Sequence, residues 1–263
     1  MFNQKVLFVD VDQTLYDNKN KKLYQSTIDI MKKISKREDI DVFLATGRSI
    51  TTLDHLKEIM PYFKGFVTNN GQSVIVNQEM IYENPVPKEY VQKLENYCNE
   101  NNVPLGYVSD YNLCVNFSNP GVIKALEQFQ LFNVEELDKK PYPYERPVKQ
   151  FWFFEFRDKI EQASKAIPEL DFVYWPGPYG CDCLNKNCSK VDGIKEVIKY
   201  YQYELENTYA IGDGDNDVSM FQQVKHSICM GNGTKLAKEA AEYITDRIEE
   251  DGFANALEKI FKL

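Results

Sequence analysis

Short apolar runs alternate with amphipathic segments along the first 60 residues of the chain. Val6–Val9 is a continuous apolar run, which is typical of a strand buried on both faces. Apolar residues at helical spacing over 28–34 predict a helix, and the apolar run Val42–Ala45 predicts a second strand. Helical spacing over 50–59 predicts a further helix. This order of strand, helix, strand and helix is typical of a parallel sheet covered by helices.

The pattern changes after residue 65, where turn residues interrupt the apolar runs. Asn69-Asn70-Gly71 and Asn77 break the segment 66–82 into short strands, which predicts hairpins that leave the sheet. Beyond Pro85 helices and strands are mixed, which predicts a separate α+β unit with its own antiparallel sheet. We expect helices over 90–98, 122–129 and 160–167, and strands over 105–108, 113–117, 151–156 and 172–175.

The alternation of strands and helices returns near residue 184. The fold class is therefore α/β, because residues 1–84 and 184–263 can combine into one doubly wound, Rossmann-like core with a parallel sheet. Residues 85–183 insert into this discontinuous core as an α+β cap domain. In the last part of the chain, strands are predicted at 209–211 and 227–230, and helices at 191–201 and 218–224.

Composition and charge exclude several classes of protein. The 263 residues include 31 Lys and Arg against 40 Asp and Glu, and the net charge of −9 repels the backbone of a nucleic acid. No apolar run approaches the roughly 18 residues that a membrane helix needs, and the first residues lack the pattern of a secretory signal. Six cysteines in a chain of this length favour reduced thiols over a disulfide framework. We therefore expect a cytoplasmic protein that binds neither nucleic acid nor membrane.

Two acidic loops follow predicted strands. Asp10 and Asp12 come directly after the first strand, and Asp213, Asp215 and Asp217 come directly after a later one. The carboxyl ends of parallel strands meet at one edge of a sheet, so the two loops can converge there. Carboxylates gathered in one place repel each other unless a cation compensates them, and a set of oxygen ligands suits Mg²⁺.

Each acidic loop taken alone has simpler explanations. Aspartate, asparagine and glycine favour turns and helix caps. The second loop has the alternating aspartates of an EF-hand, but Val224 stands where that motif requires a bidentate glutamate. The first strand is not followed by a G-x-G-x-x-G dinucleotide fingerprint. The interpretation therefore depends on what accompanies the loops.

Further motifs make the combination specific. Thr46-Gly47-Arg48 follows the second strand, and Ser189-Lys190 opens the helix after the predicted cap. With the two acidic loops, these motifs resemble those of the haloacid dehalogenase-like superfamily of phosphohydrolases, in its Cof-type branch with a type IIB cap. The resemblance covers nearly the whole chain and implies a phosphoric monoester hydrolase. Three shorter motifs fit the same family in the same order: Asn69-Asn70-Gly71, Met230-Gly231-Asn232 and Glu250-Asp251-Gly252.

The resemblance implies a role for each acidic residue. Asp10 would be the nucleophile that forms an aspartyl-phosphate, and Asp12 would be the general acid and base. One Mg²⁺ would be the cofactor. Its implied ligands are Asp10, the backbone carbonyl of Asp12, Asp213 and Asp217, the last of these directly or through water.

The resemblance also implies how the phosphoryl group is held. The Thr46 hydroxyl and the Gly47 backbone amide would donate hydrogen bonds to the phosphoryl oxygens. Lys190 would supply positive charge, which explains a cation at the first position of a helix, where the helix dipole disfavours it. Asn216 would contact the substrate or orient the lysine, although taken alone it has the features of a helix N-cap.

Gln13 departs from the family pattern, which has glycine at this position. If the backbone there needs a positive φ, glutamine strains the loop by roughly 1 kcal/mol. The orientation of the Asp12 carbonyl is the feature that such strain would disturb.

The expected substrate is a small phosphorylated metabolite, such as a sugar phosphate or a similar phosphomonoester, selected by the cap. Aromatic residues of the cap could stack on a sugar, but alternation along a strand favours a place in the core. Two alternatives remain: a phosphotransferase or phosphomutase on the same scaffold, and a phosphate-ligand sensor without turnover. The aromatic residues concerned are Phe151, Trp152, Phe153, Phe154 and Trp175.

Overall fold

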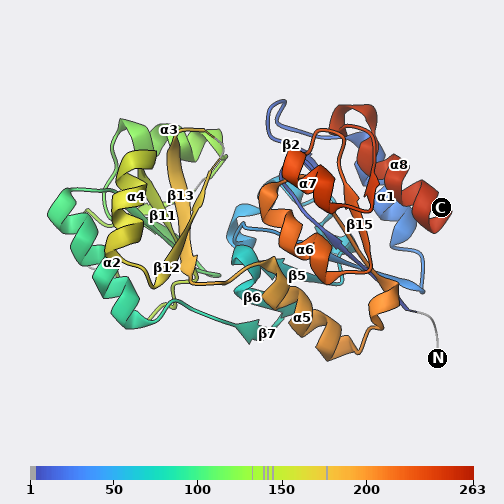
Figure 1. Cartoon of the computed structure of the whole chain (residues 1–263), viewed down its shortest axis with the longest axis horizontal. Helices are drawn as coiled ribbons and strands as arrows, with labels where there is room; N and C mark the ends of the chain where they lie inside the picture. The colour runs from blue at the N-terminus through green and yellow to red at the C-terminus, as the bar shows by residue number, and fades with distance from the viewer. Residues whose placement is uncertain (1–3, 132, 139, 141, 144, 176) are drawn as a thin grey trace. The chain divides into compact units, whose positions relative to one another are not determined.

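Contacts within the chain divide it into two compact units, each with its own sheet (Figure 1). The computed structural model describes residues 4–263 apart from 132, 139, 141, 144 and 176. The first unit comprises Met1–Arg48, Leu53–Glu83 and Ser189–Leu263, and the second comprises Ser49–Thr52 and Asn84–Cys188.

The first unit is built on an eight-stranded sheet in the order β16-β15-β14-β1-β4-β5-β6-β7. Strands β16 to β5 are parallel, and β6 and β7 join them antiparallel. The prediction that the hairpins over 66–82 leave the sheet is wrong, because β6 folds back onto β5 and pairs Ile75 with Phe66. The strands are β1 (Lys5–Val9), β4 (Ile40–Ala45), β5 (Gly65–Thr68), β6 (Ser73–Val76), β7 (Glu79–Glu83), β14 (Thr208–Gly212), β15 (His226–Cys229) and β16 (Tyr243–Ile244).

Helices cover both faces of this sheet, which confirms the doubly wound core. Phe8 of β1 packs in one apolar cluster with residues of α5 and α6. Neighbouring residues of a strand point to opposite faces, and on the other face Tyr209 of β14 meets Phe261 of α8, with ring centroids 5.0 Å apart. Helix α1 packs on α8, as Figure 1 shows. The helices of this unit are α1 (Gln25–Ile34), α5 (Lys190–Tyr201), α6 (Val218–Gln223), α7 (Lys235–Ala240) and α8 (Gly252–Phe261).

Residues 50–59 do not form the predicted helix. They form short 3-10 turns at Ile50–Thr52 and Asp54–Leu56. The Thr52 hydroxyl donates to the carbonyl of Ser49 at 2.8 Å. Local bonds of this kind compete with the α-helical ladder, and β-branched residues lower helix propensity further.

The second unit has a six-stranded sheet in the order β10-β9-β8-β11-β13-β12, antiparallel except where β10 pairs with β9. Helices α2 and α4 share an apolar cluster with one face of the sheet, and α3 contributes to a second cluster (Figure 1). The five aromatic residues named above are buried in these clusters, which confirms their core role. The elements are α2 (Lys88–Asn101), β8 (Leu105–Val108), β9 (Leu113–Val115), α3 (Pro120–Gln128), β10 (Glu135–Glu136), β11 (Gln150–Phe156), α4 (Arg157–Ala166), β12 (Leu170–Tyr174) and β13 (Tyr179–Asn185).

Strand β1 marks the point where the order of the parallel strands reverses. It pairs with β4, the next long strand in sequence, on one side, and with β14 from the end of the chain on the other. In sheets of this kind, ligands bind beyond the carboxyl ends of the strands at such a point. Among the described residues, no helix combines the length and the apolar character that crossing a bilayer would demand.

Candidate active site

Three carboxylates meet at the carboxyl ends of β1 and β14. Asp10 follows β1 and Asp213 follows β14, and the register places Val9 opposite Ile211 in the two strands. Oxygens of Asp10, Asp213 and Asp217 all lie within 4.8 Å of one another. The two acidic loops therefore converge as the sequence predicted.

The Lys190 ammonium is buried against two of these carboxylates. Its Nζ lies 2.5 Å from Oδ1 of Asp10 and 2.6 Å from Oδ1 of Asp217, and its side chain is 1% exposed. Lys190 opens α5, whose N-terminus is fixed by a capping box between Ser189 and Asp192. The carboxylates supply the negative charge that makes this cation favourable at a helix N-terminus.

The pKa values of the cluster follow from burial and repulsion. Burial and the charge of Asp217 raise the pKa of Asp10 to about 7, although Lys190 acts in the opposite direction. Burial and the charge of Asp10 raise the pKa of Asp213 to about 9. Burial alone would lower the pKa of Lys190, but the adjacent carboxylates of Asp10 and Asp217 raise it.

The cluster fits a divalent cation on charge and on ligand chemistry. With all three carboxylates ionised and Lys190 protonated, the cluster would carry a net charge of −2, which a divalent cation neutralises. All the side-chain donors are carboxylate oxygens, the ligands that Mg²⁺ prefers. The raised pKa values of Asp10 and Asp213 reflect the same excess of negative charge.

Asp217 is engaged through both of its oxygens. Oδ1 accepts from Lys190, while Oδ2 accepts from the backbone amides of Asp213 and Gly214, each at 2.9 Å. Asp213 is held more weakly, since the hydrogen bond from the Thr14 hydroxyl to its Oδ1 is long, at 3.4 Å. Asp217 thus shapes the loop and holds the lysine, and the carboxylate of Asp213 remains available to a cation.

The Thr46–Gly47 loop lies at the carboxyl end of β4, and the turn Asn69–Gly71 packs against it. Thr46 is fully buried, and its Oγ1 accepts from the backbone amide of Arg48 at 3.1 Å, so its own proton is left to donate. The backbone amide of Asn70 donates to the carbonyl of Thr46. A Cβ on Gly47 would come within 2.9 Å of Oδ1 of Asn70, so glycine permits this close approach.

Asp12 pairs with the guanidinium of Arg48 and not with Lys190. Arg48 Nε lies 2.9 Å from Oδ2 of Asp12, Arg48 Nη2 lies 2.7 Å from Oδ1, and Asn18 Nδ2 lies 2.6 Å from Oδ1. Burial acts to raise the pKa of Asp12, but the charge and hydrogen bonds of Arg48 outweigh it and lower the pKa below its usual value. Asp10 and Asp12 are two residues apart, yet one pairs with Lys190 and the other with Arg48.

Gln13 adopts a left-handed backbone conformation of the kind that glycine adopts most readily. Its φ is 62°, and its backbone amide donates to the carbonyl of Tyr16 at 2.8 Å. Its carbonyl accepts from Nδ2 of Asn232 at 2.8 Å, and Oδ1 of the same asparagine accepts from the amide of Ile248. Asn232 thus ties the loop after β1 to the last part of the chain and holds the strained residue in place.

Asn216 lies in the second acidic loop, between Asp215 and Asp217. Its side chain is exposed and folds back over Gly214, where its Oδ1 lies 2.5 Å from the position of an added Cβ. Conversely, the sequence pattern predicts no role for Arg48, Asn18 or Asn232, which all contact the loop after β1. Arg48 lies within the Thr46-Gly47-Arg48 motif, which was the one available signal for it.

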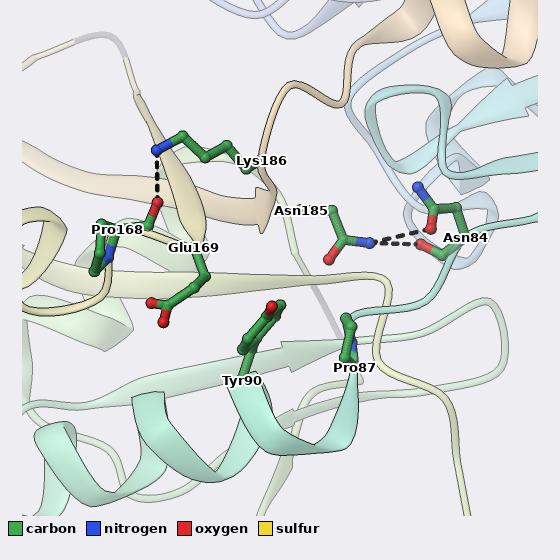
Figure 2. Close-up of a pocket in the computed structure, with 7 residues that line it drawn as sticks. All are labelled: Asn84, Pro87, Tyr90, Pro168, Glu169, Asn185 and Lys186. Carbon is green, nitrogen blue, oxygen red and sulfur yellow. Dashed lines mark hydrogen bonds between the residues drawn. The ribbon is translucent and has the colours of Figure 1, made fainter.

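A pocket of about 510 Å³ lies in the second unit (Figure 2). Nδ2 of Asn185 donates to the carbonyl and to Oδ1 of Asn84 there, which ties together the two segments that lead into and out of this unit. None of the predicted catalytic or metal-binding residues lines the pocket, so it carries no part of the chemistry described above. Its lining residues are Asn84, Pro87, Tyr90, Pro168, Glu169, Asn185 and Lys186.

The chain is similar in sequence to known hydrolases. The family model for haloacid dehalogenase-like hydrolases matches residues 7–257. The Bacillus subtilis protein YkrA, whose provisional name is that of a phosphatase, is 30% identical over 259 residues, which is 98% of each chain.

Solved structures agree as well. A protein of Geobacillus kaustophilus without assigned function superposes with a TM-score of 0.89 at 27% identity, over 99% of this chain and 100% of that one. A sugar phosphatase of haloacid dehalogenase subclass IIB superposes with a TM-score of 0.86 at 28% identity, with the same coverage.

Proposed function

The chain belongs to the haloacid dehalogenase-like hydrolases of the Cof type and is a phosphatase, and from that premise we propose that it hydrolyses small phosphorylated metabolites with Mg²⁺ through an aspartyl-phosphate. The observation that carries the proposal is the buried Asp10 carboxylate, which contacts Lys190 and lies within 4.8 Å of the oxygens of Asp213 and Asp217. A nucleophile, a fixed cation and metal-binding oxygens are thereby gathered in one place.

In the first step, a carboxylate oxygen of Asp10 attacks phosphorus while the bond to the leaving oxygen breaks. The negative charge of the bound phosphate would offset the lowering effect of Arg48 on the pKa of Asp12. The protonated carboxyl of Asp12 then gives its proton to that leaving oxygen, and the product is an alcohol. Thr46 and the Gly47 amide hydrogen-bond the phosphoryl oxygens, and Lys190 stabilises their growing charge. The enzyme is left with a phosphorylated Asp10 and an ionised Asp12.

In the second step, water attacks the phosphorus of the aspartyl-phosphate. Asp12 takes a proton from this water, the bond between Asp10 and phosphorus breaks, and inorganic phosphate leaves. Asp10 is again a carboxylate and Asp12 is again protonated, so the cycle closes without another reactant. The two hydrogen bonds from Arg48 to the carboxylate of Asp12 stabilise the ionised form of Asp12 that exists between the two steps.

Mg²⁺ would be held by Asp10, the backbone carbonyl of Asp12 and Asp213, and it supplies charge that draws the phosphoryl group toward the nucleophile. Asp217 would contribute by keeping Lys190 and the loop of Asp213 in place, because both of its oxygens already accept hydrogen bonds. A bound divalent cation would explain why three carboxylates are gathered around one ammonium at the end of the sheet.

The substrate class follows from the relatives and from the site. The subclass IIB protein named above is a sugar phosphatase, and the site residues described here recognise only a phosphoryl group. We assign sugar phosphates or similar phosphomonoesters as substrates and give the inserted domain the selection among them. Among the described residues the six cysteines form no disulfide, which fits the reducing cytoplasm that we propose as the location.

The test is phosphate release from p-nitrophenyl phosphate and a panel of sugar phosphates, with Mg²⁺ or with EDTA. We expect release that depends on Mg²⁺ and falls at least a thousandfold in Asp10→Asn, because an amide is not a nucleophile. Asp29→Asn, on the exposed side of α1, is the matched control and keeps full activity. No release by folded wild-type protein on any member would contradict the proposal, and transfer of the phosphoryl group to a second sugar would favour the phosphotransferase alternative.

A further inference from the structure

We infer that Arg48 is a positioning residue of the reaction, which holds the Asp12 carboxyl in the one orientation from which it exchanges protons with the leaving group and with water. The inference rests on the proposed function, because Asp12 is the proposed acid and base. It concerns a residue to which the proposed mechanism gives no contact with the substrate or the cation, and which would act through the side chain of Asp12.

The first support is the geometry of the contact. Nε and Nη2 of Arg48 face the two carboxylate oxygens of Asp12 at 2.9 and 2.7 Å, which is the two-bond fork that a guanidinium forms with a carboxylate. A fork fixes the plane of the carboxyl group as well as its position. The Asp12 side chain is 38% exposed, so packing alone would leave it free to change rotamer.

The second support is the way in which Arg48 itself is held. Its backbone amide donates to Oγ1 of Thr46, and its carbonyl accepts from the amide of Asn69 at 2.9 Å. The side chain of Arg48 is only 9% exposed. The guanidinium is therefore fixed relative to the same loop that is proposed to bind the phosphoryl group.

The contacts also distinguish the two oxygens of Asp12. Among the described residues, Oδ1 accepts from Asn18 and from two nitrogens of Arg48, whereas Oδ2 accepts from Nε of Arg48. Since a carboxylate oxygen has two lone pairs, Oδ2 is the oxygen with capacity left for a proton. We therefore assign the proton exchange to Oδ2.

The experiment compares kcat/KM for two kinds of leaving group. p-Nitrophenolate leaves without a proton, whereas the alkoxide of a sugar phosphate needs one. In Arg48→Gln, we expect kcat/KM to fall 10- to 100-fold for the best sugar phosphate of the panel and less than threefold for p-nitrophenyl phosphate. Arg48→Lys keeps the charge without the fork and should recover only part of the loss. In an Asp12→Asn background, Arg48→Gln should add no further loss.

Arg37→Gln is the matched control, because Arg37 forms the same fork with Asp39, at 2.7 and 2.8 Å, away from the site. It should leave both kcat/KM values unchanged. Equal losses for the two substrates in Arg48→Gln, or an additive loss in the Asp12→Asn background, would show a merely structural role and overturn the inference. An inactive wild-type protein would instead refute the proposed function, so the two failures are distinguishable.

Discussion

Gln13 shows how one residue can depart from a family pattern while the geometry of the loop is kept. Its φ of 62° is a left-handed conformation that costs a residue with a Cβ about 1–2 kcal/mol. The bond from Asn232 to its carbonyl restrains the peptide that follows. The peptide that carries the Asp12 carbonyl is restrained as well, because the Gln13 amide donates to the carbonyl of Tyr16, so this carbonyl keeps a defined direction.

We expect Gln13→Gly to change the free energy of unfolding by less than about 1 kcal/mol, because relief of strain is offset by the greater flexibility of the unfolded chain. Gln13→Val should cost about 2 kcal/mol, since a β-branched residue tolerates positive φ least. Thermal unfolding and Mg²⁺-dependent phosphate release check both variants. Loss of turnover in a stable Gln13→Gly would mean that the glutamine side chain itself has a function.

At the scale of residues, the sequence predicts the site residues that directly follow a strand, but it does not predict those that act through distant contacts. Asp10 and Asp213 were identifiable because apolar runs mark the strands that they follow. Arg48 and Asn232 act on a loop that is 36 and 219 residues away in sequence, respectively. No local pattern encodes such pairs, so only the folded chain reveals them.

The turn at Asn69–Gly71 supports the N-terminus of α5 and thereby the position of Lys190. Gly71 has a φ of +88°, and a Cβ on it would lie 2.1 Å from the carbonyl oxygen of Ser189. We expect Gly71→Ala to lower the free energy of unfolding by at least about 2 kcal/mol, from the backbone strain and the clash together. It should also lower kcat more than tenfold, because the clash displaces the residue before Lys190.

The variant Gly177→Ala separates the effect of backbone strain from the effect of the steric clash. Gly177 has a φ of +106° with no atom within 4 Å of an added Cβ, so this variant adds the backbone strain without the clash. It should cost about 1 kcal/mol and leave turnover unchanged. Thermal unfolding and steady-state kinetics of both variants provide the comparison, and equal kinetics in the two would refute a role for the turn in placing Lys190.

Whole elements were predictable where apolar periodicity was strong and uninterrupted. The strands β1, β4 and β14 and the helix α5 were predicted from such periodicity and are present in the structure. The strand β13 was missed because its buried positions include Cys181 and Cys183, which do not form an apolar run. The helix over 50–59 was wrongly predicted because side-chain bonds to the backbone, such as that of Thr52, were not visible in the apolar pattern.

For the molecule as a whole, the carboxylate cluster links stability to pH. The pKa values of Asp10 and Asp213 rise to about 7 and about 9 in the folded protein, from 3.8 as the ordinary value. Between pH 5 and pH 7 the folded protein therefore holds protons that the unfolded chain has already released. Stability falls as pH rises wherever the unfolded state binds fewer protons, so metal-free protein should lose stability across this range.

We expect the free energy of unfolding in EDTA to fall from pH 5 to pH 7, by at most about 1.4 kcal/mol per pH unit for each proton retained. Asp213→Asn removes one titrating group and should flatten this slope, and Asp29→Asn should not. Saturating Mg²⁺ should raise the stability of the wild type by about 2.7 kcal/mol at a hundredfold excess over its Kd, with little effect on Asp213→Asn at the same concentration. Calorimetry at several pH values measures all of these effects. Equal slopes in the wild type and Asp213→Asn would show that repulsion among the buried carboxylates does not limit stability, and the charge argument for a divalent cation at this cluster would then fail.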